Sequence, residues 1–547
     1  METFENIVGS LNELVWSTPA NFPFMVAVLL SFGIFITLRL GFVQIRKFKH
    51  GVLSVMGKFD HPDAVGDVNH FQALTTALSA TVGIGNIAGV AIAIHYGGPG
   101  ALFWMWVTAF FGMAVKYTEC TLAVKYRIQN ADGSVSGGPM YYIEKGLGEN
   151  WKWLAVFFAA MAVICSFLTG NAVQANTVAD TLKSTFLIPG WITGLVTASL
   201  VGFVIIGGIK RIGKVTASLM PLMAIIYVLG ALIILLMNAS EVIPAFKTIL
   251  SYAFTPKAGA FGIGSGLFLT TLVWGIKRGL FSNEAGQGSA PIAHGAARTK
   301  EPVREGVVAL LEPFIDTLVV CTMTGLVIVS TGVWQEKHDV PFSTNALETE
   351  ITVEDSGSIL TFVEGEPVNG SIIRNDFDMG IFYLDEDKTQ PFNGTIEVLE
   401  NSTVKITHED GSNLEVVHSS IVENGAPLTA MAFEKGLAPL FPGGKYIVTL
   451  CVILFGVSTA ISWSYYGDRS IQYLAGDRSI IYYKIVYLGM HFLGAVIALE
   501  TVWAIGDIAL GLMTFPNIIA LFALSGVVAT ATKKYFEKMK DFKPGAQ

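Results

Sequence analysis

The stretch that decides the fold is FSNEAGQGSAP, from Phe281 to Pro291, which places a carboxylate, two amides, two serines and several glycines and alanines within an apolar run. Backbone N–H and C=O groups cannot be left unpaired against lipid. A non-helical segment at membrane depth is therefore expected only where it is buried in protein or lines an aqueous cavity. We expect this stretch to interrupt a membrane helix beside a cavity.

The surrounding chain has the composition of an integral membrane protein. Hydrophobic residues make up 52% and charged residues 14% of the 547 residues, with a mean hydropathy of +0.55, whereas an ordinary soluble domain is about 25% charged. Because a run of about 20 apolar residues crosses the hydrocarbon core, the sequence predicts about eleven spans. These are 23–44, 70–94, 100–124, 153–180, 190–209, 215–237, 262–297, 306–334, 444–466, 481–500 and 503–531. The acidic N-terminus lacks the basic region of a cleavable signal peptide.

Basic residues gather after every second predicted span, as the positive-inside rule requires for one orientation. The clusters are Arg39–Lys49, Lys125–Arg127, Lys210–Lys214, Arg298–Arg304, Asp468–Arg478 and Lys533–Lys540. We therefore expect a multi-pass protein of the cell membrane with its N-terminus outside and its C-terminus in the cytoplasm.

A second interruption lies in the second span, at SATVGIGNIAGVA (Ser79–Ala91), where three glycines surround Asn86. With the first span set aside as an accessory helix, the two breaks open two five-helix units of opposite topology. Paired breaks in inverted repeats indicate the central site of a transporter. Glycines in membrane helices also serve close helix packing, which is the alternative for these glycines alone. A Gly-x-Gly dinucleotide loop is excluded, since no strand precedes it.

The chemistry of such breaks suits a zwitterion. Half-helix N-termini present free N–H groups and a positive dipole end to an anion, while the carbonyls freed at each break coordinate a cation. One pocket can then hold both ends of an amino acid.

An acidic insert interrupts the second repeat. Residues 335–427 alternate in polarity between Asn-Gly, Asp-Gly and Gly-Ser turn signals, which predicts a small β-rich domain outside the membrane. A gating or partner-binding cap and a solvated decoration are both open, and its partner is unknown. The predicted divisions are 1–69 (accessory helix and cytoplasmic loop), 70–237 (first repeat), 238–334 (start of the second repeat), 335–427 (insert) and 428–547 (rest of the second repeat and tail).

Three long runs carry a family resemblance: Gly97–Glu119, Ser136–Gly148 and Arg278–Ala297. They strongly resemble the alanine or glycine:cation symporter family. The resemblance implies an all-α polytopic protein of the leucine-transporter type, with discontinuous helices in a 5+5 inverted repeat. It also implies sodium-coupled uptake of a small neutral amino acid, with no enzymatic activity and no cofactor. The insert departs from the family's usual short loop.

The same resemblance implies a substrate site. The first break is expected to meet the substrate carboxylate and the second its amino group. On one helix face, a threonine is expected to hydrogen-bond the substrate, and a tryptophan four residues later is expected to close the pocket around a short side chain. The residues are Gly83, Gly85, Asn86, Ser282, Asn283, Gly286, Thr459 and Trp463, with Phe167 and Gln174 from the fourth span. For Trp463, a membrane-interface anchor is the alternative.

A sodium site is implied between the first break and the ninth span. Its expected ligands are oxygen atoms of Ser79, Val82, Phe455, Ser458 and Thr459, since sodium is a hard cation. The hydroxyl groups can instead bond to the preceding turn of their own helix.

Charged residues within the spans leave alternatives open. Glu312 and Asp316, one turn apart, can bind a cation or proton or form a structural pair, and Arg278 and Glu284 can pair across the second break. A proton-coupled or exchange carrier on the same fold is the main alternative. Because the chain has no HExxH, GxxxxGK[ST] or CxxC motif, a membrane enzyme or an ATP-driven pump is disfavoured, and no nucleic-acid partner is expected.

Overall fold

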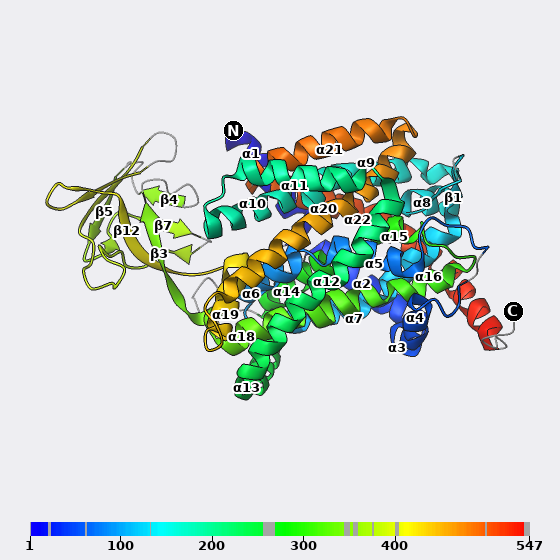
Figure 1. Ribbon diagram of the computed structural model, residues 1–547, viewed down its shortest axis with the longest axis horizontal. Helices are drawn as coiled ribbons and strands as arrows, with labels where there is room; N and C mark the ends of the chain where they lie inside the picture. Colours follow the sequence, from blue (N-terminus) through cyan, green and yellow to red (C-terminus); the bar gives the residue numbers. More distant parts are fainter. Residues whose placement is uncertain are drawn as a thin grey trace. The chain divides into compact units, whose positions relative to one another are not determined.

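The computed structural model describes residues 2–19, 23–60, 63–131, 133–254, 268–343, 350–353, 359–374, 377–399, 404–497 and 500–540. The chain divides into two compact units (Figure 1). One is helical and comprises Met1–Thr331 with Thr429–Gln547, and the other comprises Gly332–Leu428. The start of the seventh predicted span, 262–267, lies outside the described residues.

The first part of the helical unit runs from the N-terminus to the end of the first predicted repeat. Its helices are α1 (Glu2–Trp16), α2 (Phe24–Arg39), α3 (Val43–Arg46), α4 (Phe48–Val55), α5 (His70–Thr81), η1 (Gly85–Gly89), α6 (Val90–Gly97), α7 (Ala101–Tyr126), α8 (Pro139–Leu147), η2 (Glu149–Trp151), α9 (Lys152–Phe167), η3 (Leu168–Ala172), α10 (Val173–Phe186), α11 (Gly190–Ile205) and α12 (Gly208–Met237). A short antiparallel pair, β1 (Ile128–Gln129) and β2 (Val135–Ser136), precedes α8.

The second part of this unit continues through the second predicted repeat. Its helices are α13 (Ala239–Phe254), α14 (Phe268–Asn283), α15 (Ala290–His294), α16 (Pro302–Ala309), α17 (Leu311–Pro313), η4 (Phe314–Cys321), α18 (Thr322–Thr331), α19 (Gly425–Leu437), α20 (Gly444–Ala475), α21 (Ser479–Val496) and α22 (Glu500–Lys540). Here α19 begins within the second compact unit, and η5 (Val333–Gln335) lies wholly in it.

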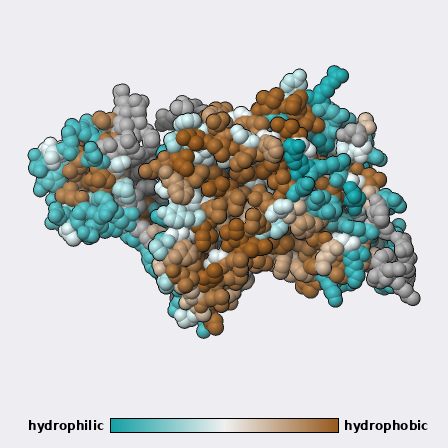
Figure 2. Space-filling view, in the orientation of Figure 1, coloured by the Kyte–Doolittle hydropathy of each residue, from teal (hydrophilic) through white to brown (hydrophobic). Residues whose placement is uncertain are grey.

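Within the described residues, six helices are long and apolar enough to cross a membrane, or seven if the bent pair of α5 and η1–α6 is one span. Two shorter apolar helices, α2 and α11, add to these. Each predicted range contains helix, but the count of eleven crossings remains a prediction. Figure 2 shows apolar side chains over most of the visible face of the helical unit, so the protein is a multi-pass membrane protein.

The helix α13, like α1, α4, α8 and α19, has no counterpart among the predicted spans. It buries Ala245, Ile249 and Ala253, which lie four residues apart on one face. The opposite face is exposed and mixed in polarity, with Ile243 and Lys247. A 16-residue amphipathic helix of this kind does not produce the continuous apolar run that marks a span.

The first break is a bend of 55° between α5 and the helix that starts at Gly85. A capping box starts α5: the side chain of Asn69 accepts a hydrogen bond from the Gln72 N–H at 2.8 Å, and the side chain of Gln72 accepts one from the Asn69 N–H at 3.1 Å. The helix stops at Thr81 and resumes as the π-helical turn η1. Such turns frequently mark functional sites.

The second break has a different backbone. Between α14 and α15, Glu284, Gly286 and Gly288 have φ angles of 53°, 89° and 86°. Left-handed conformations of this kind suit glycine because it has no Cβ atom. A helix cannot continue through three such residues, so α14 ends at Asn283, directly before Glu284.

Corresponding helices of the two predicted repeats pack on one another. The second, third and fourth helices form the pairs α7 with α16, α9 with α20 and α11 with α21, while α14 packs on α6 and η1. Two units related by a two-fold axis would produce this pairing. It supports the 5+5 inverted repeat, which itself remains a prediction.

The second compact unit is built from antiparallel strands with a core of its own. They are β3 (Lys337–Ser343), β4 (Glu350–Val353), β5 (Ile359–Val363), β6 (Glu366–Pro367), β7 (Gly370–Arg374), β8 (Phe377–Asp378), β9 (Gly394–Val398), β10 (Val404–His408), β11 (Asn413–Leu414) and β12 (Val416–Val422). The sheet orders are β11-β10-β9-β5-β6, β12-β3 and β4-β7-β8. Burial alternates along β5 because successive side chains point to opposite faces, and Phe362, Phe382 and Phe392 meet in the core.

Candidate functional site

A small cavity lies where the two breaks meet. Residues of the first break, the second break, η3, α10, α20 and α22 line it: Ala80, Thr81, Gly83, Ile84, Gly85, Thr169, Gln174, Phe281, Glu284, Thr459, Trp463 and Leu510. Its volume of about 20 Å³ is enough for about one water molecule. Five of the ten predicted substrate residues, Gly83, Gly85, Gln174, Thr459 and Trp463, therefore share one cavity.

Polar atoms at this cavity lack partners that a ligand would supply. The Oε1 atom of Gln174 is buried with no hydrogen-bond partner in the described part of the chain, while its Nε2 donates to the Thr169 carbonyl at 3.1 Å. An unpaired buried acceptor costs about 1–3 kcal/mol. A polar ligand in the cavity would recover that cost.

Trp463 is a buried wall residue with 2% of its surface exposed. Gly170 makes room for the indole, because a Cβ atom there would lie 2.3 Å from Trp463 Cγ. On the other side the indole packs edge-on against Tyr466, with 5.2 Å between ring centroids. An interface anchor would reach the membrane surface, so this burial favours the pocket interpretation of Trp463.

The first break is tied to the second through Asn86. Its Oδ1 accepts a hydrogen bond from the Gly83 N–H at 2.8 Å. Its Nδ2 donates to Asp316 Oδ1 at 2.7 Å and to Ser282 Oγ at 3.2 Å. The Gly83 N–H, which was expected to meet a substrate carboxylate, is thus occupied by the Asn86 side chain in this conformation.

Asp316 is the carboxylate at which the breaks converge. It is fully buried, and its Oδ2 accepts hydrogen bonds from Ser282 Oγ at 2.7 Å and Thr317 Oγ1 at 2.6 Å. Asn283 donates to Thr317 at 3.3 Å. Asn86, Ser282 and Asn283 therefore lie in one network beside the cavity and do not line it.

Gly286 lies apart from the cavity. Its N–H donates to Glu119 Oε2 at 3.2 Å, and its carbonyl accepts from Asn517 Nδ2 at 2.8 Å. A Cβ atom added to Gly286 would lie 2.6 Å from Leu29 Cδ2. Gly286 therefore packs against α2. Phe167 is also outside the lining and packs against Tyr483 and Tyr487 at 5.0 and 6.2 Å between centroids.

The predicted sodium ligands lie where α5 meets α20. Thr459 Oγ1 donates to the Ser79 carbonyl at 3.1 Å, and Ser79 Oγ donates to the Ser458 carbonyl at 3.1 Å. Ser458 Oγ instead donates to the Phe455 carbonyl of its own helix at 3.0 Å, which is the capping alternative. Val82 is buried at the end of α5.

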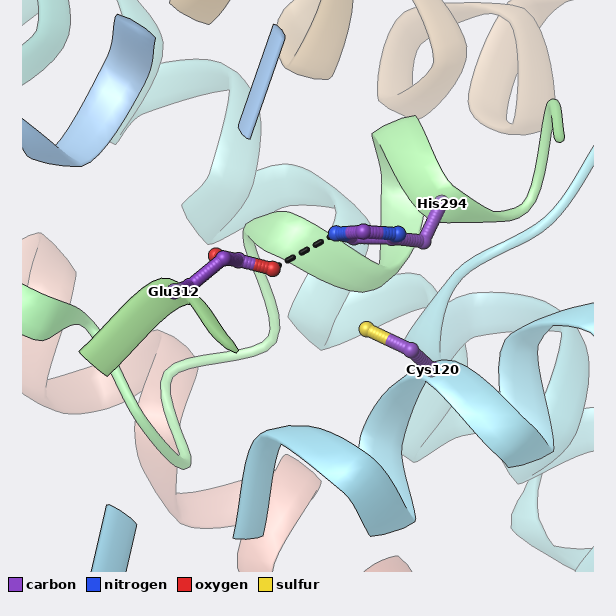
Figure 3. A group of neighbouring side chains, drawn as sticks. All are labelled: Cys120, His294 and Glu312. Atoms are coloured by element: carbon purple, nitrogen blue, oxygen red, sulfur yellow. Dashed lines mark hydrogen bonds and ion pairs between the residues drawn. The ribbon is translucent and has the colours of Figure 1, made fainter. Parts of the chain in front are cut away.

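A second buried group lies away from the cavity and joins five elements. Glu312 contacts Lys116 at 3.1 Å and His294 at 2.6 Å, and His294 and His70 both bond to Glu305. Figure 3 shows Cys120 beside His294 and Glu312, an arrangement with possible metal-ligand spacing. A metal ion there would face the Lys116 ammonium, and both ring nitrogens of His294 already have partners. The arrangement therefore fits an ion-pair network better than a metal site.

Glu119 is the buried carboxylate that holds the second break. Its carboxylate accepts hydrogen bonds from the Gly286 and Gly288 N–H groups and from Asn517 Nδ2, at 3.2, 3.0 and 2.6 Å. Its place on α7, within an apolar span, was the available signal. Arg278 and Glu284 do not pair in the described residues: Arg278 lies over Trp274, and Glu284 bonds to Ser289.

Comparisons with known proteins find similarity over nearly the whole chain. The family model "Sodium:alanine symporter family" matches residues 1–363 and 388–546, so its gap is narrower than the insert that was expected to depart from the family. The chain is 41% identical to the sodium/alanine symporter AgcS of Methanococcus maripaludis, covering 98% of each protein. It is 34% identical to the putative sodium/proton-dependent alanine carrier protein YrbD (98% and 93% covered) and 30% identical to the probable sodium/glutamine symporter GlnT (98% and 92%), both of Bacillus subtilis. The chain belongs to the sodium:alanine symporter family and is a transporter, not an enzyme.

Proposed function

We propose that this protein couples sodium influx to the uptake of a small neutral amino acid, alanine or glycine, by alternating access around the cavity between the two breaks. The observation that carries the proposal is that both breaks, Gln174, Thr459 and Trp463 line one cavity. Breaks far apart in the sequence converge where a central site is expected.

The position of Trp463 in the cavity wall supports a short substrate side chain. Trp463 is held between Gly170 and Tyr466, so it cannot retreat without displacing the η3 turn. A longer side chain would have to displace this wall. The family also contains a relative named for glutamine, which makes Trp463 the position to test for substrate size.

Substrate entry requires motion, because room for about one water molecule does not hold an amino acid. Release of Asn86 Oδ1 from the Gly83 N–H would free that amide for the substrate carboxylate. The Asn86 contacts to Asp316 and Ser282 connect this local change to α14 and η4.

Sodium is proposed to bind between α5 and α20. The Ser79 carbonyl and the Thr459 hydroxyl lie 3.1 Å apart, and an ion would replace the hydrogen bond between them with two oxygen contacts. Because these oxygens belong to different predicted repeats, an ion bound there would favour one conformation over the other.

A proton-coupled carrier is the second candidate. His70, Glu305, His294, Glu312 and Lys116 form a continuous series of buried ionisable groups, and YrbD is named for sodium/proton dependence. Such series are characteristic of proton relays in membranes.

The deciding experiment is uptake of labelled alanine and glycine into proteoliposomes of the purified protein. An inward sodium gradient should drive accumulation, and replacing sodium by potassium should abolish it. Uptake that does not depend on sodium but does depend on an inward proton gradient would rule out sodium coupling and support the proton-coupled candidate.

A paired substitution tests the cavity itself. Gln174→Met should weaken alanine affinity roughly tenfold, since a hydrogen bond to a charged group is worth about 1.5–3 kcal/mol. Gln129→Met in β1, where the side chain is exposed, is the matched control. Equal affinities in both variants would remove Gln174 from the substrate site.

A further inference from the structure

A groove on the outside of the helical unit has no role in the transport proposal. It runs between α2 and α22, has a volume of about 780 Å³ and is almost entirely apolar. Phe24 and Phe35 of α2 face Phe515 and Phe522 of α22 across it. Trp151, which is 39% exposed, closes one side.

A basic groove of about 490 Å³ lies further along α22, and the end of α2 and the helix α3 line its other side. Arg39 follows Phe35 by one turn of α2, and its guanidinium lies 5.6 Å from the Phe35 ring centroid. Phe35 in turn lies 5.0 Å from Phe522 of α22. The five cations of this basic groove are Arg39, Arg46, Lys47, Lys533 and Lys540, against one carboxylate, Glu537.

The five cations are not neutralised by the protein. In the part of the chain that the structure describes, none of them has a carboxylate oxygen within 4.0 Å. Lys47 Nζ lies 3.8 Å from the centre of the Phe536 ring. Burial, Arg46 and Lys540 together lower the pKa of Lys47, which agrees with a cluster of like charges that awaits an anion.

The position of the cluster indicates where that anion comes from. The C-terminal end of α22 lies at the same end of the helical unit as α3 and α4 (Figure 1), the end that the positive-inside rule predicts to be cytoplasmic. Basic pockets between membrane helices on that side are suited to anionic lipid headgroups.

We propose that this composite groove binds an anionic phospholipid, with an acyl chain between α2 and α22 and the phosphate among the five cations. A free phosphate would use only the basic part. In a symmetric contact with a second copy of the chain, the five cations of one copy would face the same five cations of the other, which is unfavourable.

The test is lipid retention by the purified full-length protein, measured by native mass spectrometry after incubation with equal amounts of phosphatidylglycerol and phosphatidylcholine of the same chain length. We expect phosphatidylglycerol to be retained in preference. The double substitution Lys533→Gln and Lys540→Gln should reduce its retention roughly tenfold, because each interfacial cation contributes measurably to anionic lipid binding.

The matched control lies on the other side of α22. Lys534→Gln with Lys538→Gln removes the same charge from residues that line a different groove, and it should leave the retention of phosphatidylglycerol unchanged. Equal losses in both double variants would overturn the proposal, because they would show a long-range charge effect without a site. Equal retention of the two lipids by the unmodified protein would overturn it as well.

The apolar part is tested separately. Ser31 is exposed and lines the apolar groove, so Ser31→Trp should fill the acyl-chain position and lower phosphatidylglycerol retention severalfold with all five cations intact. Unchanged retention of phosphatidylglycerol would exclude an acyl-chain site between α2 and α22. Displacement of the lipid by an equal concentration of glycerophosphate would also contradict it, since that anion has no acyl chain.

Discussion

The two breaks solve the same problem, an interrupted helix inside a membrane, with different chemistry. At the first, the backbone leaves helical geometry at Val82, where ψ is 87°, without entering left-handed conformations, and the side chain of Asn86 accepts the Gly83 N–H and donates to Asp316. At the second, the backbone enters left-handed conformations, and the carboxylate of Glu119 accepts the N–H groups of Gly286 and Gly288.

We infer from this difference that the first break moves more easily than the second. At the first break the Gly83 N–H donates to the neutral amide oxygen of Asn86. At the second, the Gly286 and Gly288 N–H groups donate to the carboxylate of Glu119, which also accepts from Asn517 of α22. Charge-assisted hydrogen bonds are roughly twice as strong as neutral ones. We therefore expect substitutions at the second break to affect mainly folding and those at the first to affect mainly transport.

The largest effect is expected from Glu119→Ala. It leaves two buried backbone N–H groups without their acceptor and removes one of the two acceptors of Asn517 Nδ2, at a cost of about 3 kcal/mol or more. The thermal unfolding temperature of the purified protein should fall strongly. Glu241→Ala, at an exposed position of α13, is the control, and a Glu119→Ala protein as stable as this control would refute the inference that the second break moves less easily.

Asn86→Ala should come next, with transport as the main readout. Sodium-driven alanine uptake should fall roughly 30- to 100-fold, corresponding to about 2–3 kcal/mol for lost hydrogen bonds to Gly83 and Asp316. The unfolding temperature should change less than in Glu119→Ala. Asn176→Ala, at a partly exposed site of α10, controls for loss of an amide; equal uptake in the two variants would contradict a role for Asn86.

Alanine substitutions of glycines compare the two backbones directly. Gly288→Ala forces a Cβ atom into a φ of 86° and to 2.7 Å from Phe158 Cε2, which should cost about 1–3 kcal/mol in unfolding free energy. Gly85→Ala meets nothing nearer than Phe281 Cδ1 at 3.4 Å and should leave stability almost unchanged while weakening alanine binding. Comparable unfolding temperatures for both variants would remove the contrast between the breaks.

The smallest effect concerns sodium. Thr459→Val removes a hydroxyl from the contact between α5 and α20, and the sodium concentration for half-maximal uptake should rise roughly tenfold, about 1.4 kcal/mol. Ser464→Ala is the control, because its hydroxyl bonds only to Ile461 of its own helix. An unchanged sodium dependence in Thr459→Val would place the ion elsewhere.

Long-range packing explains which site predictions the structure brings together. Gly83, Gly85, Gln174, Thr459 and Trp463 meet at the cavity because helix periodicity and the breaks themselves determine their faces. Gly286 belongs to the same motif as Ser282 and Asn283, yet its N–H donates to Glu119, since left-handed residues at 284, 286 and 288 redirect the backbone there. No local pattern encodes the partner of such a turn.

The sequence by itself determined that this is a polytopic membrane protein with two broken helices, because the cost of unpaired backbone groups in lipid makes polar, glycine-rich interruptions conspicuous. Its motifs also sufficed to indicate the family. Only the tertiary structure decided that Glu119 holds the second break and Asp316 joins both, through contacts with Gly286 and Asn86 that lie 167 and 230 positions away along the chain. Such partners follow from how whole helices pack, and that packing is a property of the entire fold.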